Sequence, residues 1–279
     1  MKAWIAKRPA LSFYLLTLAL SWGYWFTLLA LGLRVGPGSV AHFPGLLGPM
    51  LAAIVVTAIL GGYQAAFKLF KRMVWLGPRW AAKLMLALSP LALGAAAYGV
   101  MALLGKPLPA LSAFARAPGL PEGWPIVTVI VAVVVVNGLG EETGWRGFLT
   151  ECLLPMHGRF RATLFVASLW ALWHLPLFLL NTSMAAMVGP LLIGWLFALA
   201  CGAFVLAQVY FATGRSILCV ALWHTAYNMM ISSNVGTDFP AVVVGAAVMV
   251  WGVMVAFFWW RALPEPSASD IQVTPLSPP

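Results

Sequence analysis

Long apolar runs separated by short polar connections dominate the pattern of the chain. Eight runs are marked in the sequence, at 10–33, 43–63, 84–104, 125–149, 162–180, 189–212, 214–232 and 240–260. A helix needs about 20 apolar residues to cross the hydrocarbon core of a bilayer. The pattern therefore predicts an all-α, polytopic membrane protein with about eight transmembrane helices.

The basic residues are spread unevenly over the connections between these runs. With the N-terminus placed in the cytoplasm, the outer side of the membrane keeps only Arg34, Lys106 and Arg116 of the 16 Lys and Arg residues. Cytoplasmic connections of membrane proteins carry an excess of Lys and Arg. We therefore expect both termini in the cytoplasm, and a multi-pass protein of the cell inner (cytoplasmic) membrane.

Composition excludes a soluble globular protein, because 62% of the residues are hydrophobic and 8% are charged, against about 25% charged in soluble domains. The net charge of +9 is attractive to nucleic acid or to anionic lipid. Because the basic residues gather on the cytoplasmic connections, membrane lipids are the expected partners and nucleic acid is not. Three cysteines without CxxC spacing indicate apolar packing rather than a disulfide framework.

The same pattern divides the chain into four parts. Residues 1–124 hold the first three predicted helices, and their stretch 64–83 mixes basic and bulky apolar residues, which is typical of an amphipathic segment at the inner interface. Residues 125–232 hold helices four to seven, the expected catalytic core. Residues 233–262 hold helix eight, and 263–279, rich in Pro and Ser, is expected to be a disordered tail.

Ionisable residues fall where the pattern predicts membrane. The stretch NGLGEETGWRG, residues 137–147, places Glu141 and Glu142 near the inner end of the fourth predicted helix. A charged side chain at the bilayer centre costs about 2.5–3.5 kcal/mol on insertion scales, so such groups are functional candidates. His174 and His224 lie about 15–18 Å along the fifth and seventh predicted helices, at a rise of about 1.5 Å per residue. We expect these groups to converge on one site that opens toward the cytoplasm.

Helical spacing assigns neighbours to these residues. Side chains four positions apart share a helix face, which predicts three pairs: Glu142 with Arg146, Trp170 with His174, and His224 with Asn228. Glu141 is rotated by about 100° from Glu142, so it is free to face a different group. Asn137, one turn before Glu141, is placed to line the same cavity.

The residue types point to hydrolysis by an activated water. A buried carboxylate beside an imidazole can deprotonate water, and a second His with an Asn supplies donors for an oxyanion. A Ser or Cys nucleophile is disfavoured, because none lies one turn from either histidine or from the glutamates. Glu141, His174 and His224 are also zinc-ligand types, although the HExxH spacing is absent. A zinc metalloprotease that uses these residues as ligands therefore stays open.

Other readings of the same residues are a structural ion pair, an interhelical hydrogen-bond clamp, a proton-coupled transporter and a non-catalytic immunity or scaffold protein. Each of them explains one pair more easily than the whole set of acids, histidines and an asparagine on three helices. His42, His157 and Glu151 fall in connections or at interfaces, and we interpret them as structural or solvated.

Three short motifs give the chain a family resemblance. EETGWRG at 141–147 resembles the E-E-x-x-x-R motif of the CPBP family, which comprises CAAX prenyl protease type 2 and bacteriocin-processing (abortive infection) proteins. WALWH at 170–174 is similar to its F-x-x-x-H motif, and HTAYN at 224–228 to its H-x-x-x-N motif. Trp145 and Trp170 stand where the family often has Phe, a departure expected to affect packing more than chemistry.

The resemblance implies a glutamate-dependent intramembrane endopeptidase acting on membrane-bound peptides or proteins, including prenylated CaaX-like ones. Glu141 would be the general base, His174 would help to hold the water, and His224 with Asn228 would stabilise the oxyanion. Glu142 and Arg146 would support the site. We expect no metal cofactor, because Arg146 is placed to claim Glu142 and because Asn228 rather than a carboxylate accompanies His224.

Overall fold

The computed structural model describes residues 2–36, 39–110, 113, 120–121, 123–232 and 239–262. Throughout these residues the regular structure is helical, and the pairing of extended backbone is limited to an isolated bridge between Val35 and Asn181. This confirms the all-α prediction. The proposed disordered tail, 263–279, lies outside the described residues.

Several helices are long and apolar enough to cross a membrane. Within the described residues there are five such stretches: α2 (Pro9–Ala30), α4 (Gly48–Val74), the run Ile126–Leu180, α12 (Pro190–Ala212) and α14 (Phe239–Arg261). The pair α5 (Trp80–Ala87) and α6 (Ser89–Leu103), bent by 55°, adds a sixth. The protein is thus a multi-pass membrane protein, while the count of eight spans and the placement of the termini stay predictions.

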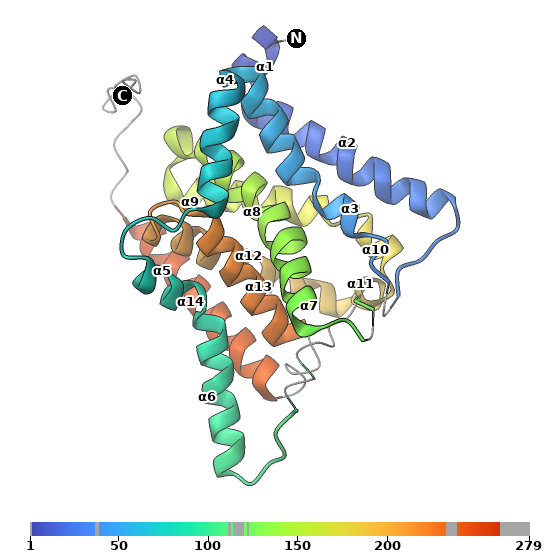
Figure 1. Cartoon of the computed structure of the whole chain (residues 1–279), viewed down its shortest axis with the longest axis vertical. Coiled ribbons are helices and arrows are strands. Elements are labelled where there is room, and N and C mark those ends of the chain that lie inside the picture. The colour runs from blue at the N-terminus through green and yellow to red at the C-terminus, as the bar shows by residue number, and fades with distance from the viewer. Residues whose placement is uncertain are drawn as a thin grey trace.

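Two of these stretches bend sharply at a glycine with a left-handed backbone. Gly62 in α4 has φ 69° and Gly158 in α9 (Glu151–Trp173) has φ 66°, a region that glycine enters without steric cost. Figure 1 shows the chain turning back at both places. Residues 63–74 therefore form a separate helical arm that covers much of the predicted amphipathic segment. The connection expected between the fourth and fifth predicted helices is reduced to the turn at Gly158.

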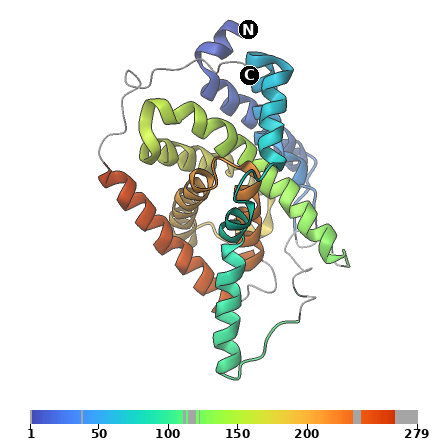
Figure 2. The same ribbon diagram turned by 60° about the vertical axis from the view of Figure 1, so that its left-hand side comes forward.

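The polar stretch of the fourth predicted helix lies at the centre of the molecule. It comprises α7 (Ile126–Val133), η2 (Val134–Leu139), α8 (Gly140–Gly144) and η3 (Trp145–Thr150), with α8 packed on α4, and η2 packed on α13 (Ile217–Ser232). Figure 1 and Figure 2 show α8 and α13 surrounded by the other helices, with α14 along one edge and α6 projecting from one end.

Buried tryptophans hold these helices together. Trp25, Trp145, Trp173 and Trp223 are fully buried. The ring centroids of Trp145 and Trp173 lie 5.7 Å apart, and those of Trp25 and Trp173 lie 5.1 Å apart. This cluster joins α2, η3 and the end of α9. It fixes the helix that carries Glu141 against the helix that carries His174.

The two connections at the ends of α2 and α9 are also tied to each other. Val35 donates its N–H to the Leu180 carbonyl over 2.9 Å, and Thr182 donates to the Val35 carbonyl over 2.9 Å. Residues 31–36, which follow α2, thereby lie beside α10 (Leu177–Leu180) and α11 (Thr182–Ala185), and α3 (Phe43–Leu46) precedes α4. In Figure 1 this end lies opposite the turn of α9.

Candidate active site

Two π-helical turns frame the adjacent glutamates. Residues of η2 precede the short α8 that carries Glu141 and Glu142, and η3 follows it. The hydroxyl of Thr150 donates to the carbonyl of Trp145, five residues earlier, over 2.9 Å. Single π turns widen a helix locally and are frequent at functional sites. The π turns direct the side chains of this stretch differently from the regular α-helix that the sequence predicted.

Glu141 is held in place by Trp170. The carboxylate is 3% exposed, and its Oε2 accepts a 2.7 Å hydrogen bond from the indole Nε1 of Trp170. As the spacing predicted, Glu141 faces a group different from the partners of Glu142. The contact gives Trp170 more than the packing role expected of it, because a phenylalanine at this position has no N–H to donate.

Glu142 joins two elements through a single oxygen. Its Oε1 lies 2.9 Å from Arg146 Nη1 and 2.8 Å from His224 Nδ1. The predicted pair of Glu142 with Arg146 is confirmed. The expectation that Arg146 alone claims this carboxylate is wrong, because His224 on α13 shares it. His224 is thus oriented by a carboxylate, and its Nε2 is directed away from Glu142.

The proton position on His174 follows from its partner. Its Nδ1 lies 2.7 Å from the backbone carbonyl of Trp170, and a carbonyl only accepts hydrogen bonds. Nδ1 therefore carries the hydrogen, and Nε2 of the neutral ring is left as an acceptor. The rings of Trp173 and Trp195 surround the imidazole, with centroids 4.8 Å and 5.3 Å away. His174 is consequently fixed in orientation and tautomer.

These side chains meet at one cavity of about 260 Å³. Six residues selected from the sequence line it: Asn137, Glu141, Trp170, His174, His224 and Asn228. Three further candidates, Glu142, Arg146 and Trp145, are at most 1% exposed and support the lining residues from the protein interior. The sequence prediction that the polar residues of three helices converge is therefore confirmed.

His42 is a lining residue that the sequence analysis set aside as structural or solvated. Burial lowers the pKa of its imidazole to about 4, and its Nδ1 is buried without a hydrogen-bond partner. A buried polar atom without a partner costs about 1–3 kcal/mol, so His42 is not explained by a structural hydrogen bond at this nitrogen. No spacing rule could have found His42, because it enters the site from a connection between helices.

The cavity extends toward one end of the molecule. From Glu141 its lining continues to His42, Asn181 and Trp195, at the end where Val35 meets α10 and α11. The predicted topology puts this end outside the cytoplasm. The sequence analysis expected cytoplasmic termini together with a site that opens to the cytoplasm. If the termini are cytoplasmic, the cavity lining extends toward the outer side of the membrane and not toward the cytoplasm.

The zinc alternative receives no support from the arrangement of ligand-type residues. Among the residues that the structure describes, no three His, Cys, Asp or Glu side chains form a group that fits a metal ion. A catalytic zinc needs three protein ligands and an open position. The chemistry is therefore derived without a metal step, although the contact of His224 with Glu142 removes both sequence arguments against zinc.

The fold and site define a multi-pass helical membrane protein with a buried Glu, His and Asn pocket between its helices. Residues 123–230, which include all of the catalytic candidates, match the family described as "Type II CAAX prenyl endopeptidase Rce1-like". This match supports the resemblance to the CPBP family seen in the three motifs.

One curated relative is similar over a short stretch. The chain is 32% identical over 54 residues to "CAAX prenyl protease 2" of Methanococcus maripaludis. The match covers 19% of this chain and 20% of the relative, so the chain aligns with about a fifth of that protein's length.

Proposed function

We propose that the protein is an intramembrane endopeptidase that hydrolyses a peptide bond of membrane-associated substrates with a water activated by Glu141. The observation that carries this proposal is the shared cavity in which Glu141, held by Trp170, and His174, with a fixed tautomer, meet His224 and Asn228. The Rce1-like match over the same residues supports the same reaction class.

The first step forms the new bond. A water in the cavity donates one hydrogen bond to Glu141 and another to Nε2 of His174, which is an acceptor. Glu141 takes a proton from this water as its oxygen attacks the carbonyl carbon of the substrate. The negative charge of the Glu141 carboxylate is thereby transferred to the former carbonyl oxygen.

The second half of the site stabilises that oxyanion. Asn228 presents an amide N–H, and His224, when both of its nitrogens carry protons, donates from Nε2 while Nδ1 donates to Glu142. Arg146 holds Glu142 from the other side. When the tetrahedral intermediate collapses, the C–N bond breaks and protonated Glu141 returns its proton to the leaving amine.

The walls of the cavity indicate the kind of substrate. Apolar side chains of Leu46, Leu177, Met184, Leu199 and Ile231 surround the polar floor, and apolar walls with a few polar groups are typical of ligand sites. An apolar side chain or a lipid next to the scissile bond fits this lining. A peptide with a prenylated, CaaX-like C-terminus is accordingly the first substrate to test.

The test is cleavage of synthetic peptides by the purified full chain, with the new C-termini identified by mass spectrometry. A prenylated CaaX peptide and its unprenylated counterpart are compared. His174→Ala is expected to abolish cleavage, whereas His157→Ala, a histidine outside the cavity lining, is expected to retain it. Equal activity of the His174→Ala variant and the wild type would refute the proposed chemistry, and equal cleavage of both peptides would refute the prenyl preference.

A further inference from the structure

A second hollow lies away from the active site and is lined by cations. A cavity of about 340 Å³ has no acidic residue among the described residues of its lining, which includes five basic side chains: Lys68, Lys71, Arg72, Lys83 and Arg215. We name it the basic pocket. It is built where the arm 63–74 of α4, the connection 75–79 and the turn between α12 and α13 come together. None of these residues takes part in the proposed hydrolysis.

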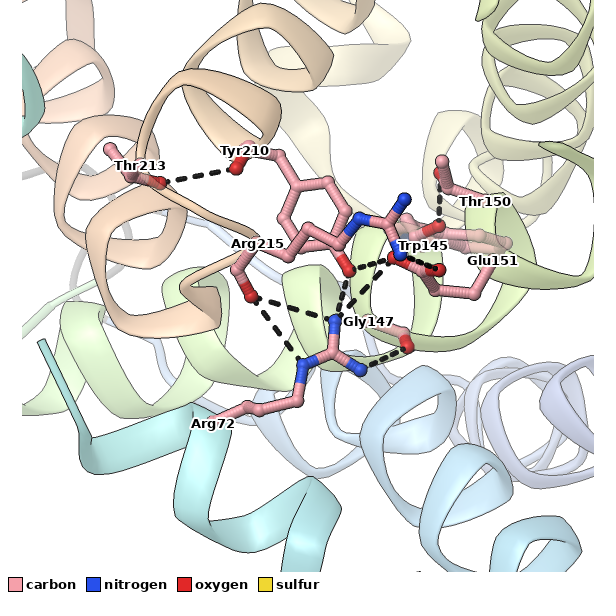
Figure 3. A network of polar contacts seen from close by, with 8 residues as sticks. All are labelled: Arg72, Trp145, Gly147, Thr150, Glu151, Tyr210, Thr213 and Arg215. Carbon is pink, nitrogen blue, oxygen red and sulfur yellow. Dashed lines mark hydrogen bonds and ion pairs between the residues drawn. The ribbon is translucent and has the colours of Figure 1, made fainter. Parts of the chain in front are cut away.

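Two of the five cations are fixed by a polar network beneath the pocket, which Figure 3 shows. Arg72 donates to the carbonyls of Gly147 and Arg215 and to the hydroxyl of Tyr210. The Tyr210 hydroxyl in turn donates to Glu151 over 2.5 Å, and Arg215 Nη1 lies 3.1 Å from the other oxygen of Glu151. Glu151 is thus structural, as the sequence analysis interpreted it, and one carboxylate faces two arginines.

No acidic residue that the structure describes forms an ion pair with the lysines of the pocket. Lys83 donates from Nζ to the carbonyl of Leu76 over 2.7 Å, which leaves its charge uncompensated. Lys71 Nζ lies 5.7 Å from the ring centroid of Trp75, and Lys68 is exposed. Ammonium groups that converge without carboxylates repel one another, and a bound anion relieves this repulsion.

Backbone strain accompanies the pocket. Among the described residues, the non-glycine positions with positive φ are Arg215 (64°) in its lining and Arg79 (57°) in the connection beside it. A left-handed backbone costs a residue with a Cβ roughly 1–2 kcal/mol. Such strain clusters at ligand clamps and other functional sites, where the surrounding structure holds it in place. At Arg215 the Tyr210 carbonyl does this, accepting the N–H over 2.7 Å.

Exposed aromatic side chains flank the pocket and indicate where it lies relative to the membrane. Phe67, Phe70, Trp75 and Trp80 are each at least 52% exposed. Tryptophans concentrate at membrane–water interfaces, so this rim is suited to the boundary between acyl chains and headgroups. Basic pockets between membrane helices bind anionic headgroups. A ligand that fits both the cations and the aromatic rim therefore carries a phosphate and an acyl chain.

We propose that the basic pocket binds the phosphate of an anionic phospholipid headgroup. The inference is independent of the proposed hydrolysis, since it rests on residues outside the active site. Free phosphate shares the anionic chemistry but has no part that fits the aromatic rim. The pocket would hold the lipid in the leaflet that the basic connections face.

The test is lipid binding to the purified full chain in a neutral detergent, followed by native mass spectrometry during titration. Phosphatidylglycerol, phosphatidylcholine and glycerol phosphate are the three probes. The wild type is expected to bind phosphatidylglycerol more tightly than phosphatidylcholine, with glycerol phosphate competing weakly. Lys68→Gln combined with Lys71→Gln should weaken phosphatidylglycerol binding by about 25-fold, since each basic contact with an anionic lipid contributes roughly fivefold.

The matched control is Lys2→Gln combined with Lys7→Gln. It removes the same charge from exposed lysines of α1 (Lys2–Lys7), outside the pocket, and should keep wild-type binding. Equal affinity for both lipids, or an equal loss in the control, would overturn the proposal. Full competition by glycerol phosphate would assign the pocket to free phosphate and overturn the lipid assignment. If the double variant does not fold, Lys68→Gln alone should weaken binding about fivefold, and unchanged binding in that variant would also overturn the proposal.

Discussion

Trp170 contacts three residues of the active site through its side chain and its backbone. Its indole N–H holds Glu141, its carbonyl fixes the tautomer of His174, and its ring lies under the guanidinium of Arg146 at 5.0 Å. A cation over an aromatic face stabilises the charge where water is excluded. Trp170 is therefore a positioning residue whose loss should affect the chemical step rather than the fold.

Trp170→Phe tests this role against a matched change. The substitution removes the donor to Glu141, and a hydrogen bond to a charged group contributes about 1.5–3 kcal/mol. We expect kcat of peptide cleavage to fall by roughly 10- to 100-fold with KM little changed. Trp145→Phe is the control, because the Trp145 indole N–H is buried without a partner, and its kcat should stay within about threefold. Similar kinetics for the two variants would assign Trp170 to packing alone.

At the residue scale, spacing along helices predicted much of the site but not its cross-links. The i, i+4 rule correctly placed Glu142 beside Arg146 and Trp170 beside His174, since both partners lie on one helix. The contacts of Glu141 with Trp170 and of Glu142 with His224 join residues 29 and 82 positions apart. Such contacts depend on how helices pack, which a single sequence does not encode in any local pattern. His42 could not be predicted as a lining residue for the same reason, because its place in the cavity depends on how the helices pack.

At the scale of elements, the helix 126–150 departs from the regular geometry that its apolar pattern predicted. A run of valines followed by polar residues carries no periodic signal for the π turns of η2 and η3. The glycines of NGLGEETGWRG explain why this helix packs closely against its neighbours. A Cβ at Gly144 would lie 2.5 Å from the Cβ of Pro49 and 2.7 Å from its carbonyl oxygen. The start of α4 thus contacts the backbone of α8 directly.

Gly144→Ala should therefore separate α8 from α4 and disturb Glu141 nearby. Forcing an extra carbon into a packed interior costs about 1–3 kcal/mol. We expect a lower midpoint of thermal unfolding in detergent and weaker peptide cleavage. Gly194→Ala on α12 is the control, because a Cβ there meets no atom within 4 Å. Equal stability of the two variants would show that the α4–α8 contact can relax.

At the scale of the whole molecule, the apolar pattern correctly predicted a helical, multi-pass protein and placed breaks close to both sharp turns. The second predicted helix ends at residue 63, next to Gly62, and the predicted connection 150–161 contains Gly158. The pattern did not predict that the chain stays helical on both sides of each glycine. The predicted orientation in the membrane rests on charge alone, because Lys and Arg are expected on the cytoplasmic side. In that orientation the cavity lining extends toward the outer side, where His42 and Asn181 lie.

Cysteine labelling in intact cells tests this orientation. In a Cys152→Ala background, Met156→Cys reports on the turn of α9 and Ser183→Cys on the connection beside the cavity; both positions are exposed. The predicted topology makes Met156→Cys inaccessible and Ser183→Cys accessible to an impermeant reagent added outside. The reverse pattern would invert the topology and turn the cavity toward the cytoplasm, as the sequence analysis expected of the site.

Hydrolysis is predicted to proceed without a metal. The described residues supply no group of three His, Cys, Asp or Glu ligands, whereas Glu141 and His174 suffice to hold and deprotonate a water. Elemental analysis of active protein should find no stoichiometric metal, and prolonged chelation should leave cleavage unchanged. Stoichiometric zinc whose removal stops cleavage and whose return restores it would make the protein a metalloprotease.

The role of Glu141 as general base is tested most directly by kcat for peptide cleavage by Glu141→Gln. The amide keeps the size of the side chain and can still accept from Trp170, but it cannot take a proton from water. General-base catalysis contributes about 10²- to 10⁴-fold, so kcat should fall by at least 100-fold while the protein stays folded. A Glu141→Gln variant that cleaves within threefold of the wild-type kcat would contradict water activation by Glu141.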